Sequence, residues 1–174
     1  MKTIYNYLNE YSESDFYGMH MPGHKRNEKM MENDLPYKID ITEIDGFDDL
    51  HHADGIIREA QERAARLYCA DETHFLVNGS TVGILSAIMG VTDKQDQILV
   101  ARNCHKSVYH AIYLNELKPV YVYPEYDEKT GLNGEVRVDD ITLLLDKNPN
   151  IKAVMIVSPT YDGVVSDVKK IAEV

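Results

Sequence analysis

Short apolar runs alternate with helical patterns along the second half of the chain, and this alternation most constrains the fold. Three apolar runs are typical of buried strands, at residues 97–101, 119–123 and 153–157. Helical patterns carried by residues 108–114 and 143–145 separate them. A turn-rich loop is expected at 125–135, and Asp139 or Asp140 is expected to cap the second helix. Strands that alternate with helices form βαβ units with parallel strands. We therefore expect an α/β fold with a mainly parallel sheet and flanking helices.

Residues 75–85 form a further candidate junction between a strand and a helix. Apolar residues 75–77 predict a short buried strand, Asn78-Gly79 predicts a turn, and Ser80 and Thr81 stand where a helix should begin. The first amides of a helix have no partners of their own, and the helix dipole favours negative charge there. Gly79 lets the backbone approach a ligand closely, and the two hydroxyls add donors. The stretch therefore predicts a phosphate site.

Two observations limit this interpretation of Gly79, Ser80 and Thr81. Serine and threonine are also ordinary helix caps, so a purely structural role stays open. The stretch lacks the lysine of a nucleoside-triphosphate loop and the glycine spacing of a dinucleotide-binding motif. A phosphate carried by another kind of small molecule is the remaining prediction.

Polar side chains follow each expected strand. Ligands of parallel sheets bind beyond the carboxyl ends of the strands. These ends are residues 78–81, 102–107, 123–126 and 158–163. His105 lies in one of them at the start of a helix, where it either caps the helix or contacts a ligand.

The first 70 residues carry helical patterns and a loop rich in cations. Residues 4–11 predict a helix, and a second helix is expected after Asp54 as its cap, with an apolar face at 56–68. Between them, residues 16–26 contain Pro22-Gly23 and form a loop with two histidines and two cations. This loop is either solvated or placed at the mouth of a binding site.

Composition excludes several classes of protein. The chain has 18 basic against 29 acidic residues and a formal net charge of -11, which argues against non-specific nucleic-acid binding. No apolar run is long enough to cross a membrane, and the N-terminus lacks the apolar core of a signal peptide. Cys69 and Cys104 form no disulfide framework, so we expect a cytoplasmic protein with reduced thiols.

A metal site is not expected from the histidines. His51 and His52 are adjacent, so their side chains point apart on a helix or a strand. His20 and His24 have the spacing of helical ligands, but Pro22-Gly23 lies between them. At the other end, residues 167–174 begin a helix at Asp167 without a stop signal, so we expect a fragment of a longer protein.

Five motifs at these positions occur in an order that resembles a known family. They are residues 21–25, 42–51, 78–83, 103–107 and 158–163. Together they resemble the N-terminal part of the bacterial ornithine/lysine/arginine decarboxylases, and most of all the shorter arginine-decarboxylase-like members. The resemblance covers almost the whole chain, which would be well under half of a family member.

The resemblance implies a cofactor, a substrate and a role for each site residue. It implies pyridoxal phosphate bound to part of the large domain of the aspartate-aminotransferase fold. Gly79, Ser80 and Thr81 would hold the cofactor phosphate, and His105 would stack on the ring as a catalytic residue. The substrate would be arginine, lysine or ornithine, and the protein would be a homo-oligomer with active sites at a dimer interface.

The resemblance also implies how the chain is divided and what it lacks. Residues 1–50 would form the N-terminal helix with active-site or interface loops, and residues 51–174 would form a partial cofactor-binding domain. The Schiff-base lysine and the acid that faces the pyridine nitrogen lie in family motifs absent from this sequence. The fragment is therefore expected to be inactive. The 75–77 strand should lack its partners, which makes the fragment marginal, rearranged or oligomeric.

Three other interpretations stay open. Aminotransferases and lyases share the implied fold, and substrate choice lies largely outside this region. A non-catalytic α/β domain that binds a phosphorylated small molecule would also explain the phosphate site. The last alternative is a structural fragment without activity.

Overall fold

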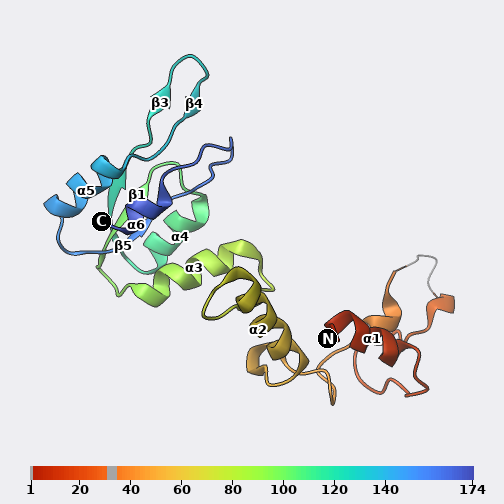
Figure 1. The fold of residues 1–174 in the computed structure, drawn as a ribbon. Helices are drawn as coiled ribbons and strands as arrows, with labels where there is room; N and C mark the ends of the chain where they lie inside the picture. Colours follow the sequence, from red (N-terminus) through yellow and green to blue (C-terminus); the bar gives the residue numbers. More distant parts are fainter. Residues whose placement is uncertain (1, 31–34) are drawn as a thin grey trace. The chain divides into compact units, whose positions relative to one another are not determined.

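The computed structural model describes residues 2–30 and 35–174, which divide into two compact units between Phe75 and Leu76 (Figure 1). Helix α2 (Ile56–Tyr68) belongs to the first unit, with helix α1 (Ile4–Ser12). Arg63 Nη1 donates a hydrogen bond to the Lys2 carbonyl at 3.2 Å and so ties α2 to the start of α1. The family resemblance instead implies a division into residues 1–50 and a partial cofactor-binding domain at 51–174. This functional division stays a prediction.

The first unit is built from α1, α2 and three short 3₁₀ helices. The 3₁₀ helices are η1 (Glu28–Met30), η2 (Tyr37–Ile39) and η3 (Leu50–His52). Helix α1 confirms the expected helix at 4–11, and the Thr3 side chain caps it by accepting from the Asn6 amide at 3.2 Å. The cationic loop is fastened to α1, because Arg26 Nη1 donates to the Tyr11 carbonyl at 2.9 Å.

Helix α2 begins differently from the prediction. Gly55, not Asp54, occupies its N-cap and offers no side-chain acceptor. The carboxylate of Asp48 takes that role and accepts from the Gly55 and Ile57 amides at 2.9 and 3.0 Å. The expected apolar face is also only partly covered, since Leu67 and Tyr68 in the last turn are exposed.

The second unit contains a parallel three-stranded sheet in the order β2-β1-β5. The strands are β1 (Gln97–Ala101), β2 (Lys118–Val122) and β5 (Ile151–Met155). They confirm the three expected strands, and the second and third are shifted by one and two residues. In register, Leu99 of the central strand lies opposite Val120 on one side and Val154 on the other.

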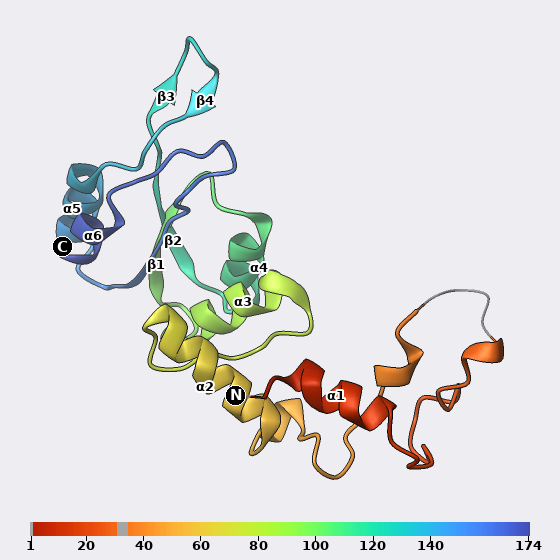
Figure 2. The same cartoon turned by 45° about the vertical axis from the view of Figure 1, so that its right-hand side comes forward.

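Two layers of helices cover the sheet. Helices α3 (Gly79–Val91) and α4 (Lys106–Leu114) lie on one face, and α5 (Val138–Lys147) and α6 (Val168–Ala172) lie on the other (Figures 1 and 2). The core between these layers consists of side chains with no exposed area, namely Ile98, Leu99, Val100, Ala101, Val108, Ala111 and Ile141. An apolar strand such as β1 is therefore buried on both faces, as parallel strands usually are.

The expected strand at residues 75–77 is not formed. The segment is irregular and belongs to no sheet, and Phe75, Leu76 and Val77 are 40, 50 and 68% exposed. The prediction of a buried strand is therefore wrong for this structure. Only the second half of the predicted junction is confirmed, because α3 does begin at Gly79.

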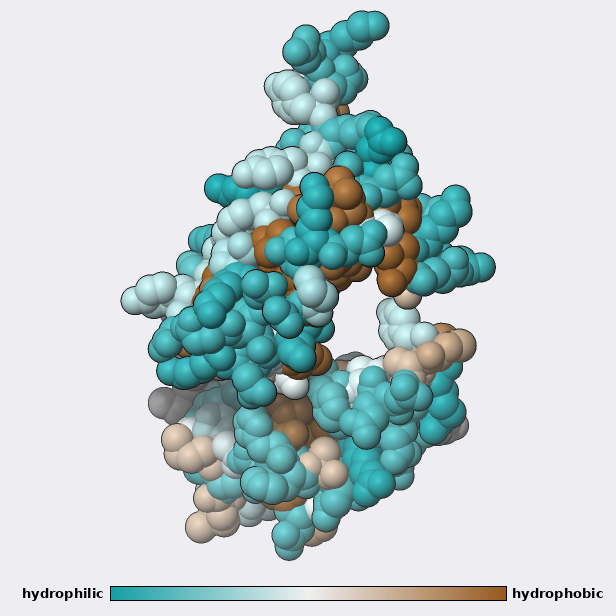
Figure 3. Space-filling model, turned by 90° about the vertical axis from the view of Figure 1, so that its left-hand side faces the viewer, coloured by the Kyte–Doolittle hydropathy of each residue, from teal (hydrophilic) through white to brown (hydrophobic). Residues whose placement is uncertain are grey.

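Two smaller predictions in the second unit also need correction. Arg137, not Asp139 or Asp140, is the N-cap of α5, and the two aspartates lie in its first turn. The region 125–135, expected as a loop, contains the hairpin β3 (Tyr126–Asp127) and β4 (Leu132–Asn133). Mostly hydrophilic side chains cover this hairpin at the top of Figure 3. The expected cap at Asp167 is confirmed, since its side chain accepts from the Lys170 amide at 3.1 Å.

Candidate functional site

The carboxyl ends of the three parallel strands meet at one edge of the sheet. The segments 102–105, 123–125 and 156–166 leave the sheet there, because β1, β2 and β5 run in the same direction. Three of the four sequence-predicted ligand segments are thus brought to a single edge. The fourth, residues 78–81, follows an irregular segment and not a strand.

The start of α3 has the features of an open anion site. Gly79 has φ +71°, which side chains rarely adopt, and a Cβ built on it would meet no atom within 4 Å. Among the described residues, the side chain at the N-cap position, Asn78, makes no capping hydrogen bond. Ser80 and Thr81 are exposed. The first amides of α3 therefore keep unused donors beside two accessible hydroxyls.

His105 occupies the N-cap of α4, which begins one residue later. Its Nδ1 accepts from the Ser107 amide at 3.2 Å and lies 2.9 Å from the Ser107 hydroxyl. Ser107 is fully buried, whereas His105 is exposed. The imidazole is thus held at one nitrogen by a buried partner and remains accessible to a ligand.

Helices α3 and α4 pack against each other, so the elements that carry the two parts of the predicted site are neighbours (Figures 1 and 2). Among the described residues, no hydrogen bond joins the side chains of Ser80 or Thr81 to His105. The two helices are thus in contact and lie in the same helical layer, but the hydroxyls of Ser80 and Thr81 are not hydrogen-bonded to the imidazole of His105.

Sequence reasoning missed a clamp on the turn before His105. The Tyr109 hydroxyl donates to the Arg102 carbonyl at 2.7 Å and accepts from Arg102 Nη1 at 2.8 Å. The Arg102 guanidinium also stands over the Tyr109 and Tyr121 rings, 5.2 and 5.5 Å from their centres. The hydrogen bond that the Arg102 guanidinium donates to the Tyr109 hydroxyl raises the pKa of Arg102. The sequence hints at these contacts only by placing an arginine after a strand and aromatic residues on the next helix and the next strand.

Two further polar groups lie in the same turn. The Cys104 thiol donates to the Met155 carbonyl at 3.6 Å, and burial raises the pKa of this thiol to about 11. Among the described residues, the Asn103 Oδ1 atom is buried without a hydrogen-bond partner. A buried acceptor of this kind is costly unless a donor reaches it.

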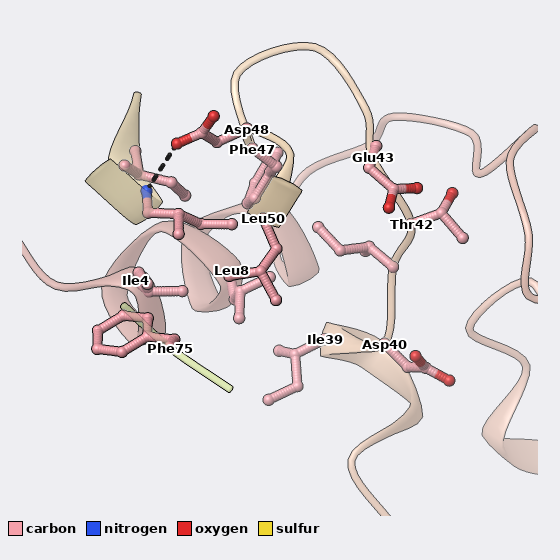
Figure 4. A pocket seen from close by; sticks show the side chains of 13 residues that line it. Ile4, Leu8, Ile39, Asp40, Thr42, Glu43, Phe47, Asp48, Leu50 and Phe75 are labelled. Atoms are coloured by element: carbon pink, nitrogen blue, oxygen red, sulfur yellow. Dashed lines mark hydrogen bonds between the residues drawn. The ribbon is translucent and has the colours of Figure 1, made fainter. Parts of the chain in front are cut away.

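The first unit contains an apolar pocket of about 460 Å³ (Figure 4). Side chains of α1, η2, η3, α2 and the segment after them converge on it, including Leu8, Ile39 and Phe75. The dashed line in Figure 4 marks the bond from the Ile57 amide to Asp48, which fixes one wall. Asp40 also lines the pocket, and its Oδ2 atom forms a hydrogen bond with His24 Nε2 at 3.2 Å. The pocket holds no residue of the predicted site.

The described residues, 2–30 and 35–174, show neither a cluster of metal ligands nor a membrane-spanning helix. They contain no group of three or more histidine, cysteine or acidic side chains that could hold a metal ion. None of their helices combines the length and the apolar character that a membrane span requires.

The fold and the edge of the sheet define a class: α/β proteins that bind small ligands where parallel strands end and helices begin. Comparison with known proteins makes this specific. The chain belongs to the ornithine/lysine/arginine decarboxylase family, because the family model described as "Orn/Lys/Arg decarboxylase, major domain" matches residues 2–174. The family resemblance deduced from five motifs is thereby confirmed.

Curated relatives and solved structures agree with this family. The chain is 38% identical over 160 residues to a protein named arginine decarboxylase from Halalkalibacterium halodurans, covering 88% of this chain and 33% of the relative. It is 39% identical over 173 residues to Bacillus subtilis YaaO, named as uncharacterized, covering 97% and 36%. Its fold matches the Escherichia coli constitutive lysine decarboxylase with a TM-score of 0.78 at 22% identity, covering 98% of this chain and 27% of that one. The chain spans about a third of the length of the curated relatives.

Proposed function

We propose that this chain supplies the phosphate site and the ring-facing imidazole of a pyridoxal-phosphate-dependent decarboxylase acting on a basic amino acid, namely arginine, lysine or ornithine. One observation carries the proposal: in a chain of this family, α3 begins with a glycine at positive φ and two exposed hydroxyls, and its cap position makes no capping bond within the part of the chain that the structure describes. Relatives named arginine decarboxylase support the substrate class.

The residues at the start of α3 fit a phosphate group. Gly79 leaves open space where a Cβ would stand, so an anion can approach the helix backbone. Ser80 and Thr81 add hydroxyl donors, and hydrogen bonds to a charged phosphate are stronger than those between neutral groups. In this proposal, Gly79, Ser80 and Thr81 bind and orient the phosphate.

The residues after β1 fit the ring of the cofactor. When bound, pyridoxal phosphate acts as an electron sink for the bond that breaks at the substrate's α-carbon. His105 offers a flat, exposed imidazole that covers one side of the ring in this proposal. The clamp between Arg102 and Tyr109 holds the turn that carries it.

The test is a titration of the protein with pyridoxal phosphate, followed by absorbance. The double variant Ser80→Ala/Thr81→Ala should bind about tenfold or more weakly, because two donors to a charged group are lost. Ser86→Ala is the matched control, since Ser86 is also exposed on α3 but lies about one and a half turns further along. Equal affinity of the double variant and the control would remove these residues from the site.

Two other expectations accompany this function. The homo-oligomeric state stays a prediction, and analytical ultracentrifugation across a range of protein concentrations tests it. The cytoplasmic location also stays a prediction.

A further inference from the structure

Two polar groups converge on one nitrogen of the His105 imidazole. Both come from Ser107: its amide, 3.2 Å from Nδ1, and its hydroxyl, 2.9 Å from the same atom. Ser107 has no exposed area, so its hydroxyl does not exchange this partner for bulk water. The ring is thus anchored at Nδ1 from the protein interior.

This geometry determines which nitrogen carries the proton. A backbone N–H only donates, so Nδ1 must present its single in-plane lone pair to the Ser107 amide. A proton on Nδ1 would face the amide hydrogen and break this bond. A neutral imidazole with an unprotonated Nδ1 carries its hydrogen on Nε2.

The backbone around His105 is fixed from several sides. The Arg102 amide donates to the Val122 carbonyl at 2.9 Å, and the Cys104 amide donates to the Ala101 carbonyl at 3.0 Å. Beyond the turn, the Val108 amide donates to the His105 carbonyl at 3.0 Å. Because the turn is fixed before and after His105, the bond at Nδ1 also fixes the orientation of the ring.

We propose that Ser107 is a positioning residue that keeps His105 in the neutral Nε2–H form, so that this histidine meets its ligand as a hydrogen-bond donor and not as a proton acceptor. The identity of that ligand as the cofactor or its substrate rests on the proposed function above. In this form both nitrogens are committed, since Nδ1 accepts from Ser107 and Nε2 already bears a hydrogen. An anionic or carbonyl oxygen is the chemical group that such a donor recognises.

Capping of α4 alone does not explain a histidine at this position. A helix cap requires only a side-chain oxygen or nitrogen that accepts from the first amides, and asparagine or serine does this well. The variant His105→Asn therefore separates the two roles. It keeps an acceptor for the Ser107 amide and removes the flat ring together with its Nε2–H group.

The direct measurement is a long-range proton–nitrogen correlation spectrum of the full chain labelled with ¹⁵N-histidine, recorded first without ligand. We expect His105 to have an unprotonated Nδ1 and a protonated Nε2. Exposed His110, on the same helix, serves as an internal reference. A protonated Nδ1 at His105 would overturn the inference.

Ser107→Ala tests the part that the hydroxyl plays. The variant keeps the amide donor and loses one of two donors to Nδ1, so the share of the Nδ1–H form at His105 should rise about two- to tenfold. An unchanged share would remove the hydroxyl from the mechanism. If this variant fails to fold, the spectrum of the unsubstituted chain still decides the tautomer.

Addition of pyridoxal phosphate separates this inference from the proposed function. We expect the Nε2 resonance of His105 to shift while Nδ1 stays unprotonated, and we expect His105→Asn to bind the cofactor more weakly at an unchanged unfolding midpoint. Protonation of Nδ1 on ligand binding would overturn the inference that Ser107 keeps this nitrogen unprotonated. If the His105 nitrogen resonances do not shift when pyridoxal phosphate is added, the ring-facing site is refuted. The ligand-free spectrum would still test the role of Ser107 independently.

Discussion

Asp48 is the residue at which a single substitution should change the first unit most selectively. Its carboxylate accepts five backbone hydrogen bonds: Oδ1 from the Asp49 and Asp54 amides, and Oδ2 from the Gly55, Ile57 and Arg58 amides at 2.9, 3.0 and 3.3 Å. Asp48 itself has φ +68°. One side chain thus closes the 48–54 turn and satisfies the amides that begin α2.

Asp48→Asn is the suitable change, because asparagine tolerates a positive φ and has nearly the same shape. Its single carbonyl oxygen can serve only one of the two sets of amides. Its NH₂ group must then face the amides of the other set, donor against donor. Loss of the charge and of one set of bonds should cost about 2 kcal/mol of unfolding free energy.

The deficit should depend on pH. Partial desolvation acts to raise the pKa of Asp48, but the backbone donors outweigh it and hold this pKa well below its usual range. A carboxyl with a depressed pKa in the folded state contributes stability above its unfolded pKa of about 3.9, and this contribution is lost as the pH falls toward the folded value. The difference between the protein and the variant should therefore be smaller at pH 3 than at pH 7.

Urea unfolding at the two pH values measures this difference, and hydrogen exchange at the Ile57 and Arg58 amides locates it at the start of α2. Asp45→Asn is the control, since it removes the same charge from an exposed position three residues away. Equal stabilities of Asp48→Asn and Asp45→Asn at pH 7 would refute the reasoning. A deficit that does not shrink at pH 3 would refute the electrostatic part.

Three further predictions concern the second unit. Leu99→Ala should lower the unfolding free energy by about 2–5 kcal/mol, because Leu99 is fully buried on the central strand; denaturant unfolding measures this. Cys104 should react with iodoacetamide at pH 8 on the order of a hundredfold more slowly than a free thiol, because burial raises its pKa to about 11; peptide mapping compares it with exposed Cys69. Tyr109→Phe should speed amide exchange at Cys104, because both hydrogen bonds to Arg102 are lost; unchanged exchange would remove the clamp from the account.

The sheet could be predicted because its strands are local, apolar and separated by helices. The run at 97–101 coincides with β1, and the alternation alone implies the parallel order that brings the carboxyl ends to one edge. The expected fold class is therefore confirmed, and the match to a lysine decarboxylase structure agrees with it. The sequence pattern predicted the wrong cap for α2, because a residue outside the local window supplies the acceptor. Asp54 precedes α2, but Asp48 reaches its amides because a positive φ turns the chain back.

The candidate site was predictable as a set of residue types and not as a set of contacts. Glycine and hydroxyls at a helix start are visible in the sequence, and α3 does begin there. The hydrogen bond from the Ser107 amide to His105 depends on the backbone of His105 itself. Its dihedral angles, φ -61° and ψ 150°, place Nδ1 over the first turn of α4. The link between Arg102 and Tyr109 spans seven residues across a turn, so no periodic pattern reveals it.

The irregular course of residues 75–77 shows that pairing decides whether an apolar run becomes a strand. These side chains are as apolar as those of β1, yet they remain 40–68% exposed, while β1 has a hydrogen-bonded neighbour on each side. A strand without a neighbour leaves its amides and carbonyls to water and gains nothing from its extended form. The start of α3 does not depend on such pairing, because Gly79 supplies the turn and the helix supplies its own hydrogen bonds. The positive-φ glycine and the exposed hydroxyls at the start of α3 can therefore form even where the strand expected before them does not.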